Sequence, residues 1–466
     1  MQTYRCTDLK VGKNKGAPRV WLEGQRLAKA GFSPGQHYHV DTGHGRVVLT
    51  IQANGARVVS VKKRNDRQRP VIDLNSAKDL GLFEGLEKIR VIVRKGEIHL
   101  LPLASQLKAR ERLERVERKI AAKQPLTVGS LCHGGGVLSL ALHKGMKAEG
   151  VATELGFAND IDPTVLDHAS EHNPAWSNKT VSVAAPMQEL MTDDWLIKQL
   201  GTCEILEAGI PCVAASLSGR AKKGLKMAEE DPNAGHLVVP FLAIVQAVQP
   251  ALILVENVPP YQNTASAHLI RNTLRDWGYS VHETVLAAGE FGALENRKRM
   301  ALVAVTAGLA FDASAMAPPH MKCQSTVGEI LEDMADDARC WSEMGYLRDK
   351  EARDRAAGKG FRMQILGPAD TQVGTIGADY QKNRSTEPKL RHPTKGDALL
   401  RLFTPIEHAR IKGIPESVIT GLPATRAHKL LGNSICFEPF VRVGKAIART
   451  LNHQPRQART AMPDAA

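Results

Sequence analysis

A cysteine at position 212 stands where a reactive side chain would be useful. The apolar run over 203–208 predicts a buried strand of a parallel sheet, and Gly209 and Pro211 end it just before Cys212. Open α/β sheets bind their ligands in the crevice beyond the carboxyl ends of the strands, so this position favours a nucleophile. A free cysteine is more often a small buried hydrophobic residue, so this interpretation depends on the neighbouring motifs.

Glu256 is expected at the same edge of the sheet as Cys212. The continuous apolar run over 252–255 predicts a second buried parallel strand, and Glu256 follows it directly. Arg297 and Arg299 precede another apolar strand, and in an extended chain residues two apart lie on one face. This edge of the sheet would therefore bring a thiol and a carboxyl group together.

A glycine-rich turn predicts a site for a nucleotide-like ligand. The segment 126–131 is expected to be a strand, 132–136 contains three glycines, and an apolar helix begins at Val137. Asp160 ends the next apolar stretch, where a carboxylate can accept hydrogen bonds from ribose hydroxyls. Asp162 also fits the N-cap of the following helix, so the two roles can coexist on neighbouring residues. Three glycines alone can equally serve a tight turn.

The composition favours a polyanionic partner and a reducing compartment. The 466-residue chain has a formal net charge of +13 and a pI of about 9.4, which favours nucleic acid because neutralised phosphates release counterions. A basic surface without a partner is the alternative. The seven cysteines form no CxxC pair and follow no signal peptide, so we expect a cytosolic protein without disulfides or a zinc site. No apolar run is long enough to span a bilayer.

Residues 1–103 are expected to form a small β-rich module with a faint internal repeat. The two copies, 19–52 and 70–103, each run as a strand, a short helical turn ending in glycine, a strand, a tight turn and a strand. This pattern resembles the swapped-hairpin fold of AbrB-like and SymE-like proteins, in which two such units interleave into one barrel. The basic run 62–69 is either a solvated loop or a phosphate contact. A charged helix over 104–124 would connect this module to a larger domain.

The larger domain is similar to cytosine-C5 DNA methyltransferases, because short motifs recur in the order found in that family. After the glycine-rich turn these motifs are Asp160-Ile161-Asp162, Pro211-Cys212, Glu256-Asn257-Val258, Arg297-Lys298-Arg299 and Gly432-Asn433-Ser434. The segment 401–415 looks like the family's penultimate motif. The resemblance covers residues 126 to about 452, and the ordered set is far more specific than any one member.

The resemblance implies an α/β fold: a Rossmann-like, S-adenosylmethionine-dependent methyltransferase domain with a small inserted target-recognition domain. The catalytic domain would comprise 125–305 and 373–452, and the insertion 306–372. The segment 374–380 looks like the strand that returns from the insertion. The last residues, 453–466, are expected to be a disordered tail.

The resemblance also implies a role for each site residue. Cys212 would add to C6 of a cytosine flipped out of the duplex, Glu256 would protonate or hydrogen-bond the ring, and Arg297 and Arg299 would orient the base and stabilise negative charge. The methyl donor would be S-adenosylmethionine, and no metal is expected. The residues expected to hold the cofactor are Leu131, Cys132, Gly134, Gly136, Asp160, Ile161, Ile210, Asn433 and Ser434.

Several positions depart from the family's pattern. Ser130 and Cys132 stand where an acid and an aromatic residue are usual, Val213 and Glu295 each replace a glutamine, and 185–187 replaces the usual Asp-Ile. The nucleophile, the carboxylate and the arginines are kept, so we expect an active enzyme.

We expect double-stranded DNA as the partner and no association with a membrane. We expect the protein in the bacterial cytoplasm, associated with the nucleoid, with a role in restriction-modification. We expect a monomer, with the N-terminal module as the surface through which a dimer would form. Two alternatives stay open. One is a DNA-binding regulator with a vestigial methyltransferase half, and the other is an RNA cytosine-C5 methyltransferase.

Overall fold

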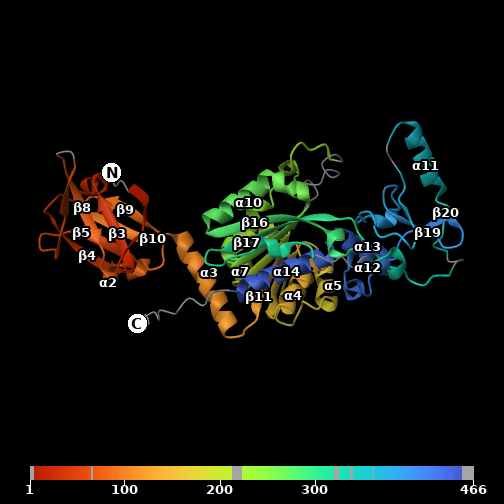
Figure 1. The fold of residues 1–466 in the computed structure, drawn as a ribbon, viewed down its shortest axis with the longest axis horizontal. Helices are drawn as coiled ribbons and strands as arrows, with labels where there is room; N and C mark the ends of the chain where they lie inside the picture. Colours follow the sequence, from red (N-terminus) through yellow and green to blue (C-terminus); the bar gives the residue numbers. More distant parts are fainter. Residues whose placement is uncertain are drawn as a thin grey trace. The chain divides into compact units, whose positions relative to one another are not determined.

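The computed structural model describes residues 5–64, 67–211, 223–319, 325–335, 339–359 and 362–453 (Figure 1). The chain divides into two compact units, Met1–Glu111 and Arg112–Ala466. Within the described ranges, no helix combines the length and the apolar character needed to cross a membrane. The expected nucleophile Cys212, the departure at Val213 and nearly all of the expected tail lie outside the described residues.

The N-terminal unit repeats one order of elements twice. The first copy is β3 (Ala17–Glu23), α1 (Gln25–Ala30), β4 (His37–Gly43) and β5 (Arg46–Ile51), and the second is β8 (Arg67–Leu74), α2 (Ala77–Leu80), β9 (Lys88–Arg94) and β10 (Glu97–Pro102). Equivalent strands pair with each other, because β3 is antiparallel to β8 and β5 is antiparallel to β10. The short strands β1 (Arg5–Lys10), β2 (Gly12–Asn14), β6 (Arg57–Val58) and β7 (Ser60–Arg64) complete two sheets. The likeness to AbrB-like proteins stays a prediction.

A seven-stranded sheet forms the centre of the second unit, in the order β13-β12-β11-β14-β15-β17-β16. Its strands are β11 (Leu126–Leu131), β12 (Thr153–Asp160), β13 (Val181–Ala184), β14 (Ile205–Gly209), β15 (Leu252–Asn257), β16 (Tyr279–Ala287) and β17 (Lys298–Thr306). The first five are parallel, and β17 runs antiparallel to both of its neighbours. Because β12 and β14 flank β11 on opposite sides, the order in which strands are added to the sheet reverses at β11. Open α/β sheets bind their ligands at such a point. The predicted α/β methyltransferase fold is confirmed.

Helices cover both faces of this sheet. The alternation of β15 divides the core, with Leu252 and Leu254 in one hydrophobic cluster and Ile253 and Val255 in the other. The first cluster includes α4 (Val137–Ala148), α5 (Pro163–His172) and α14 (Phe437–Asn452), and the second includes α6 (Met187–Thr192), α9 (Val238–Val248) and α10 (Ala265–Asp276). The short α7 (Asp194–Gln199) packs beside the second cluster.

The helices α4 and α14 cross at a pair of glycines. A Cβ on Gly145 would lie 2.2 Å from the carbonyl oxygen of Val441, and one on Gly444 would lie 2.7 Å from that of Leu142. Only glycine permits this approach. The crossing places the C-terminal part of the chain against the helix that follows the glycine-rich turn.

The smaller region after β17 differs from the sequence prediction. Its elements are α11 (Gly345–Ala356), β18 (Ile365–Leu366), β19 (Lys389–His392) and β20 (Gly396–Arg401), followed by α12 (Pro405–Lys412) and α13 (Ala424–Asn433). The predicted strand over 374–380 is wrong, because only a single bridge forms, between Val373 and Glu295. The three-stranded sheet instead continues to Arg401, beyond the predicted end of the insertion at 372.

The predicted connecting helix forms as α3 (Ala104–Ala121), and its second half is part of the catalytic unit. Arg112 is 1% exposed and donates to the hydroxyl of Thr306 and the carbonyl of Trp277. Arg115 and Lys119 both contact the buried carboxylate of Glu204, at 2.9 and 2.7 Å. The positive charges of this helix therefore do not all face solvent.

Replacing Arg115 and Lys119 together by methionine should destabilise the catalytic unit by about 3–5 kcal/mol, because the buried carboxylate of Glu204 would lose both cations. Urea unfolding measures the loss. Arg118→Met, on the exposed face of the same helix, is the matched control and should change stability by less than about 0.5 kcal/mol. Equal unfolding midpoints for the two proteins would show that α3 is only a tether.

Candidate active site

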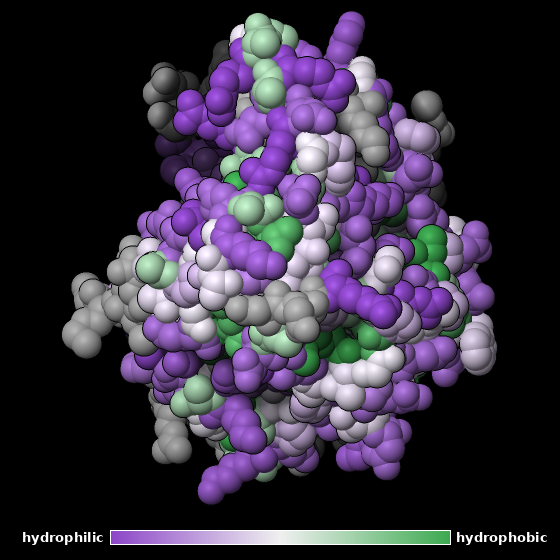
Figure 2. Space-filling model, turned by 90° about the vertical axis from the view of Figure 1, so that its right-hand side faces the viewer, coloured by the Kyte–Doolittle hydropathy of each residue, from purple (hydrophilic) through white to green (hydrophobic). Residues whose placement is uncertain are grey.

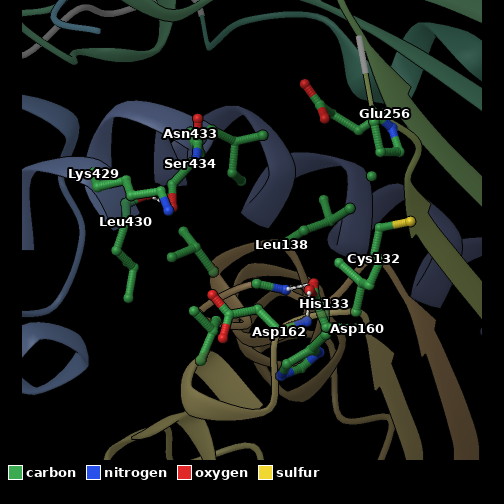
Figure 3. Close-up of a pocket in the computed structure, with 18 of the residues that line it drawn as sticks. Cys132, His133, Leu138, Asp160, Asp162, Glu256, Lys429, Leu430, Asn433 and Ser434 are labelled. Carbon is green, nitrogen blue, oxygen red and sulfur yellow. Dashed lines mark hydrogen bonds between the residues drawn. The ribbon is translucent and has the colours of Figure 1, made fainter. Parts of the chain in front are cut away.

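A cavity of about 590 Å³ opens at the carboxyl ends of β11, β12, β14 and β15 (Figure 3). The predicted site residues in its wall are Cys132, Gly134, Asp160, Ile161, Ile210, Glu256, Arg299, Asn433 and Ser434. Three others do not line it. Leu131 is fully buried in the core, Gly136 precedes α4, and Arg297 lies behind the wall, where it donates to the carbonyl of Gly432 at 3.0 Å.

The glycine-rich turn is tied to the end of β12. Asp160 accepts a hydrogen bond from the amide of Gly134 at 2.8 Å and another from the amide of Asp162 at 3.1 Å. The side chain of Asp162 caps α5, as predicted. A Cβ on Gly136 would lie 2.4 Å from the side chains of Asn173 and His133, so a glycine is required there. The loop thus holds the Asp160 carboxylate at the cavity wall.

Cys132 lines the cavity, but its thiol lacks the low pKa of a nucleophile. It has a φ of +54°, which is unusual for a residue with a side chain. Burial, and after it the carboxylates of Asp160 and Glu207, raise the pKa of the Cys132 thiol far above its ordinary value. The thiol therefore stays protonated, and only a thiolate is an effective nucleophile.

Glu256 and Arg299 form an ion pair inside the cavity. The Nε atom of Arg299 lies 2.8 Å from Oε1 of Glu256, and both side chains are largely buried. Burial raises the pKa of Glu256, and Arg299 and then Arg297 partly offset this effect. The protonated form of Glu256 is therefore more populated than that of a carboxyl group in water. This suits a group that donates a proton.

A buried ion pair connects the arginine strand to the C-terminal motif. The ammonium group of Lys412 lies 2.5 Å from the carboxylate of Glu295, and both side chains have 0% exposure. The same carboxylate accepts hydrogen bonds from the thiol of Cys436 at 3.2 Å and the amide of Ile376 at 2.8 Å. Lys412 also donates to the carbonyl of Ser434 at 3.4 Å. The unusual glutamate at 295 thus has Lys412 as its close cation, and Arg297 lies 3.8 Å from the same carboxylate.

The C-terminal motif, 432–434, lies at the end of α13, and this helix packs closely against the segment 374–380. A Cβ on Gly432 would lie 2.3 Å from the amide nitrogen of Ala378, so the 374–380 segment lies directly against α13. This packing, with the hydrogen bond from Ile376 to Glu295, replaces the predicted strand. Asn433 and Ser434 then follow at the cavity wall.

Sequence reasoning did not identify several wall residues. They include Leu138, Glu207, Arg426, Lys429 and Leu430. Glu207 had a visible signal, because it is a charged residue inside an otherwise apolar strand. Arg426 and Lys429 on α13 had no such signal in the sequence, because polar positions on a helix are ordinarily solvated.

Lys412→Met should destabilise the catalytic unit by about 3–5 kcal/mol, because the buried Glu295 carboxylate would lose its close cation and keep only Arg297, at 3.8 Å. Adding Glu295→Gln should recover most of this loss, since a neutral amide can still accept from Ile376. Urea unfolding of the single and double variants checks this coupling. A double variant no more stable than the single one would contradict it.

Comparison with known proteins agrees with this arrangement. The family model described as C-5 cytosine-specific DNA methylase matches residues 126–453. Type II methyltransferase M.SsoII of Shigella sonnei is 30% identical over 55% of this chain and 66% of its own length, and M.NlaX of Neisseria lactamica is 34% identical over 51% and 74%. The Dnmt2 methyltransferase of S. pombe has a similar fold, with a TM-score of 0.54 and 19% identity over 70% of this chain and 98% of that one. The chain therefore belongs to the C-5 cytosine-specific DNA methylase family, a family of DNA cytosine-5 methyltransferases.

Proposed function

We propose that this protein transfers a methyl group from S-adenosylmethionine to C5 of a flipped cytosine in double-stranded DNA, through a covalent adduct with Cys212. One observation carries the proposal: a single cavity joins the turn held by Asp160 to the Glu256–Arg299 pair. Pro211, the residue before Cys212, also lines this cavity. The cofactor and the flipped base would thus bind in the same cavity.

The cavity fits a nucleoside-type cofactor. Its volume of about 590 Å³ lies within the roughly 300–1,000 Å³ of ligand pockets. Asp160 would accept from ribose hydroxyls, and Ile161, 69% exposed in the cavity wall, offers apolar surface that a flat ring would cover. Cys132, Gly134, Ile210, Asn433 and Ser434 are the further wall residues that would hold the group. Bound S-adenosylmethionine supplies an electrophilic methyl group.

The protein's own groups then activate the base. The Cys212 thiolate forms a bond to C6, and Glu256 places a proton or a hydrogen bond at N3, so that C5 becomes electron-rich. Arg299 positions Glu256, and Arg297 supports this region from behind. After methyl transfer, a water molecule takes the proton from C5, the bond from sulfur to C6 breaks to restore the thiolate, and any proton on N3 returns to Glu256. The base must leave the duplex to reach this cavity.

Charge and surface character support nucleic acid as the substrate. The net charge is +13, and the face shown in Figure 2 is mostly hydrophilic, with hydrophobic residues only in small separate patches. Transfer of labelled methyl groups by the purified protein to duplex DNA and to tRNA tests the substrate. We expect label in DNA. Label in tRNA alone would favour the RNA methyltransferase, and specific DNA binding without label in either would favour the regulator.

Cys212→Ser should abolish methyl transfer, because an alcohol is far less readily ionised than a thiol. Wild-type protein should also form a stable adduct with DNA that contains 5-fluorocytosine, where loss of the C5 substituent is blocked. Cys340→Ser, at an exposed position, is the control and should retain full activity. Methylation by the Cys212 variant would contradict the assignment.

Glu256→Gln should lower turnover by about 10²–10⁴-fold, the usual contribution of general acid–base assistance, with little change in cofactor affinity. Single-turnover rates and cofactor titrations separate the two effects. Glu290→Gln, at an exposed position, provides the matched control. An unchanged rate would mean that Glu256 only anchors Arg299.

A further inference from the structure

A second buried carboxyl group lines the cavity and has no part in the chemistry above. Glu207 lies on β14 with 2% of its surface exposed and forms part of the cavity wall. It stands directly opposite Ser130 on the parallel strand β11, and the Ser130 hydroxyl lowers the pKa of Glu207. A carboxyl group in a buried strand is costly unless it is paired or neutral.

The hydrogen bonds behind Glu207 have a fixed direction. The indole N–H of Trp176, which can only donate, donates to Nε2 of His133 at 3.0 Å. Burial lowers the pKa of His133 to about 3, so the ring is neutral and its one proton is on Nδ1. That proton is donated to the Ser130 hydroxyl at 2.7 Å, and the Ser130 proton is then directed to Glu207. Glu207 therefore receives a hydrogen bond, which favours its ionised form.

Glu207 nevertheless keeps its proton at neutral pH in the protein alone. Burial, and after it the negative charge of Glu256, raise the pKa of Glu207 to about 8. The titratable groups that face it are Glu256 on β15, which is paired with Arg299, and Cys132 in the loop after β11, which stays a thiol. A positively charged ligand beside Glu207 would favour the carboxylate.

Glu207 lies two residues from the junction between two parts of the cavity. Asp160 lines one part and Glu256 lines the other (Figure 3). At their junction a Cβ on Gly209 would lie 3.8 Å from the carbonyl oxygen of Cys132 and 3.7 Å from Oε2 of Glu256. Glu207 is two residues before Gly209 on β14 and so faces the same side of the sheet. A group that passes from cofactor to base must cross this junction.

We infer that Glu207 contacts the cofactor and recognises the positive charge of its sulfonium centre, so that the protein distinguishes S-adenosylmethionine from the uncharged product S-adenosylhomocysteine. This inference rests on the proposed function, which supplies the cofactor. Loss of the positive charge on methyl transfer removes the partner of the carboxylate. Glu207 then takes up a proton again, and product binding is weakened.

The sign of the pH dependence follows from this exchange. A group that is protonated in the free protein and ionised in the complex releases its proton on binding. Affinity for S-adenosylmethionine should therefore rise with pH below about pH 8, by up to about tenfold per pH unit, and level off above it. The affinity for S-adenosylhomocysteine should not show this rise with pH, because the product carries no sulfonium charge.

Isothermal titration calorimetry of the full-length protein in buffers of different ionisation enthalpy counts the released protons. At pH 7 the wild type should release more protons with S-adenosylmethionine than Glu207→Gln does, by up to about one per site. At pH 8 the variant should bind S-adenosylmethionine about tenfold to a hundredfold more weakly, the usual range for a lost charged hydrogen bond. Its affinity for S-adenosylhomocysteine should change by less than about threefold.

Glu256→Gln identifies the source of the proton. If that variant loses the proton release and Glu207→Gln keeps it, Glu256 is the titrating group and the inference is wrong. Equal proton release by wild type and Glu207→Gln would also overturn it, as would affinity that falls with rising pH. If the wild type binds no S-adenosylmethionine, the proposed function itself fails.

Ser130→Ala provides a second test that leaves the carboxyl group in place. Without the Ser130 hydrogen bond the carboxylate is less stable, so the rise in affinity should move to higher pH. Circular dichroism and thermal unfolding confirm that each variant is folded. An unmoved profile in folded Ser130→Ala would contradict the role given to the network.

Discussion

A buried ion pair between Glu295 and Lys412 is the contact on which the active site depends. These side chains lie 117 positions apart in sequence and have 0% exposure. Glu295 immediately precedes the segment with Arg297 and Arg299, and Lys412 donates to the carbonyl of Ser434. The pair therefore joins the segment with the two arginines to the C-terminal wall of the cavity. Because buried charges are costly without a close partner, loss of Lys412 or of Glu295 would disturb both of these segments.

Two carboxyl groups on neighbouring strands have different surroundings in the cavity. Burial raises the pKa of both, but Glu256 is paired with Arg299, whereas Glu207 stands opposite the hydroxyl of Ser130, which lowers its pKa in part. Groups whose environments differ in this way can serve different steps, as we propose for Glu256 and Glu207. The register of the adjacent parallel strands β14 and β15 places Glu256 beside Gly209, two residues further along the sheet than Glu207.

The strands and turns of the site were predictable from sequence because their signals are local. A continuous apolar run marked β15, a mostly apolar run marked β14, and the turn after β11 was marked by its glycines. The Lys412–Glu295 pair was not predictable, because a lysine in the last turn of a helix ordinarily serves the helix dipole. The strand predicted over 374–380 failed for a related reason. Its backbone bonds to the side chain of Glu295 and packs on Gly432, contacts that no short segment specifies.

The most direct measurement is a map of 5-methylcytosine in the DNA of cells that express the protein. The account predicts new 5-methylcytosine at one recurrent sequence context in cells with the wild type, and none in cells with Cys212→Ser. Unmodified DNA in cells that contain folded wild-type protein, or the same pattern from the Cys212 variant, would contradict it.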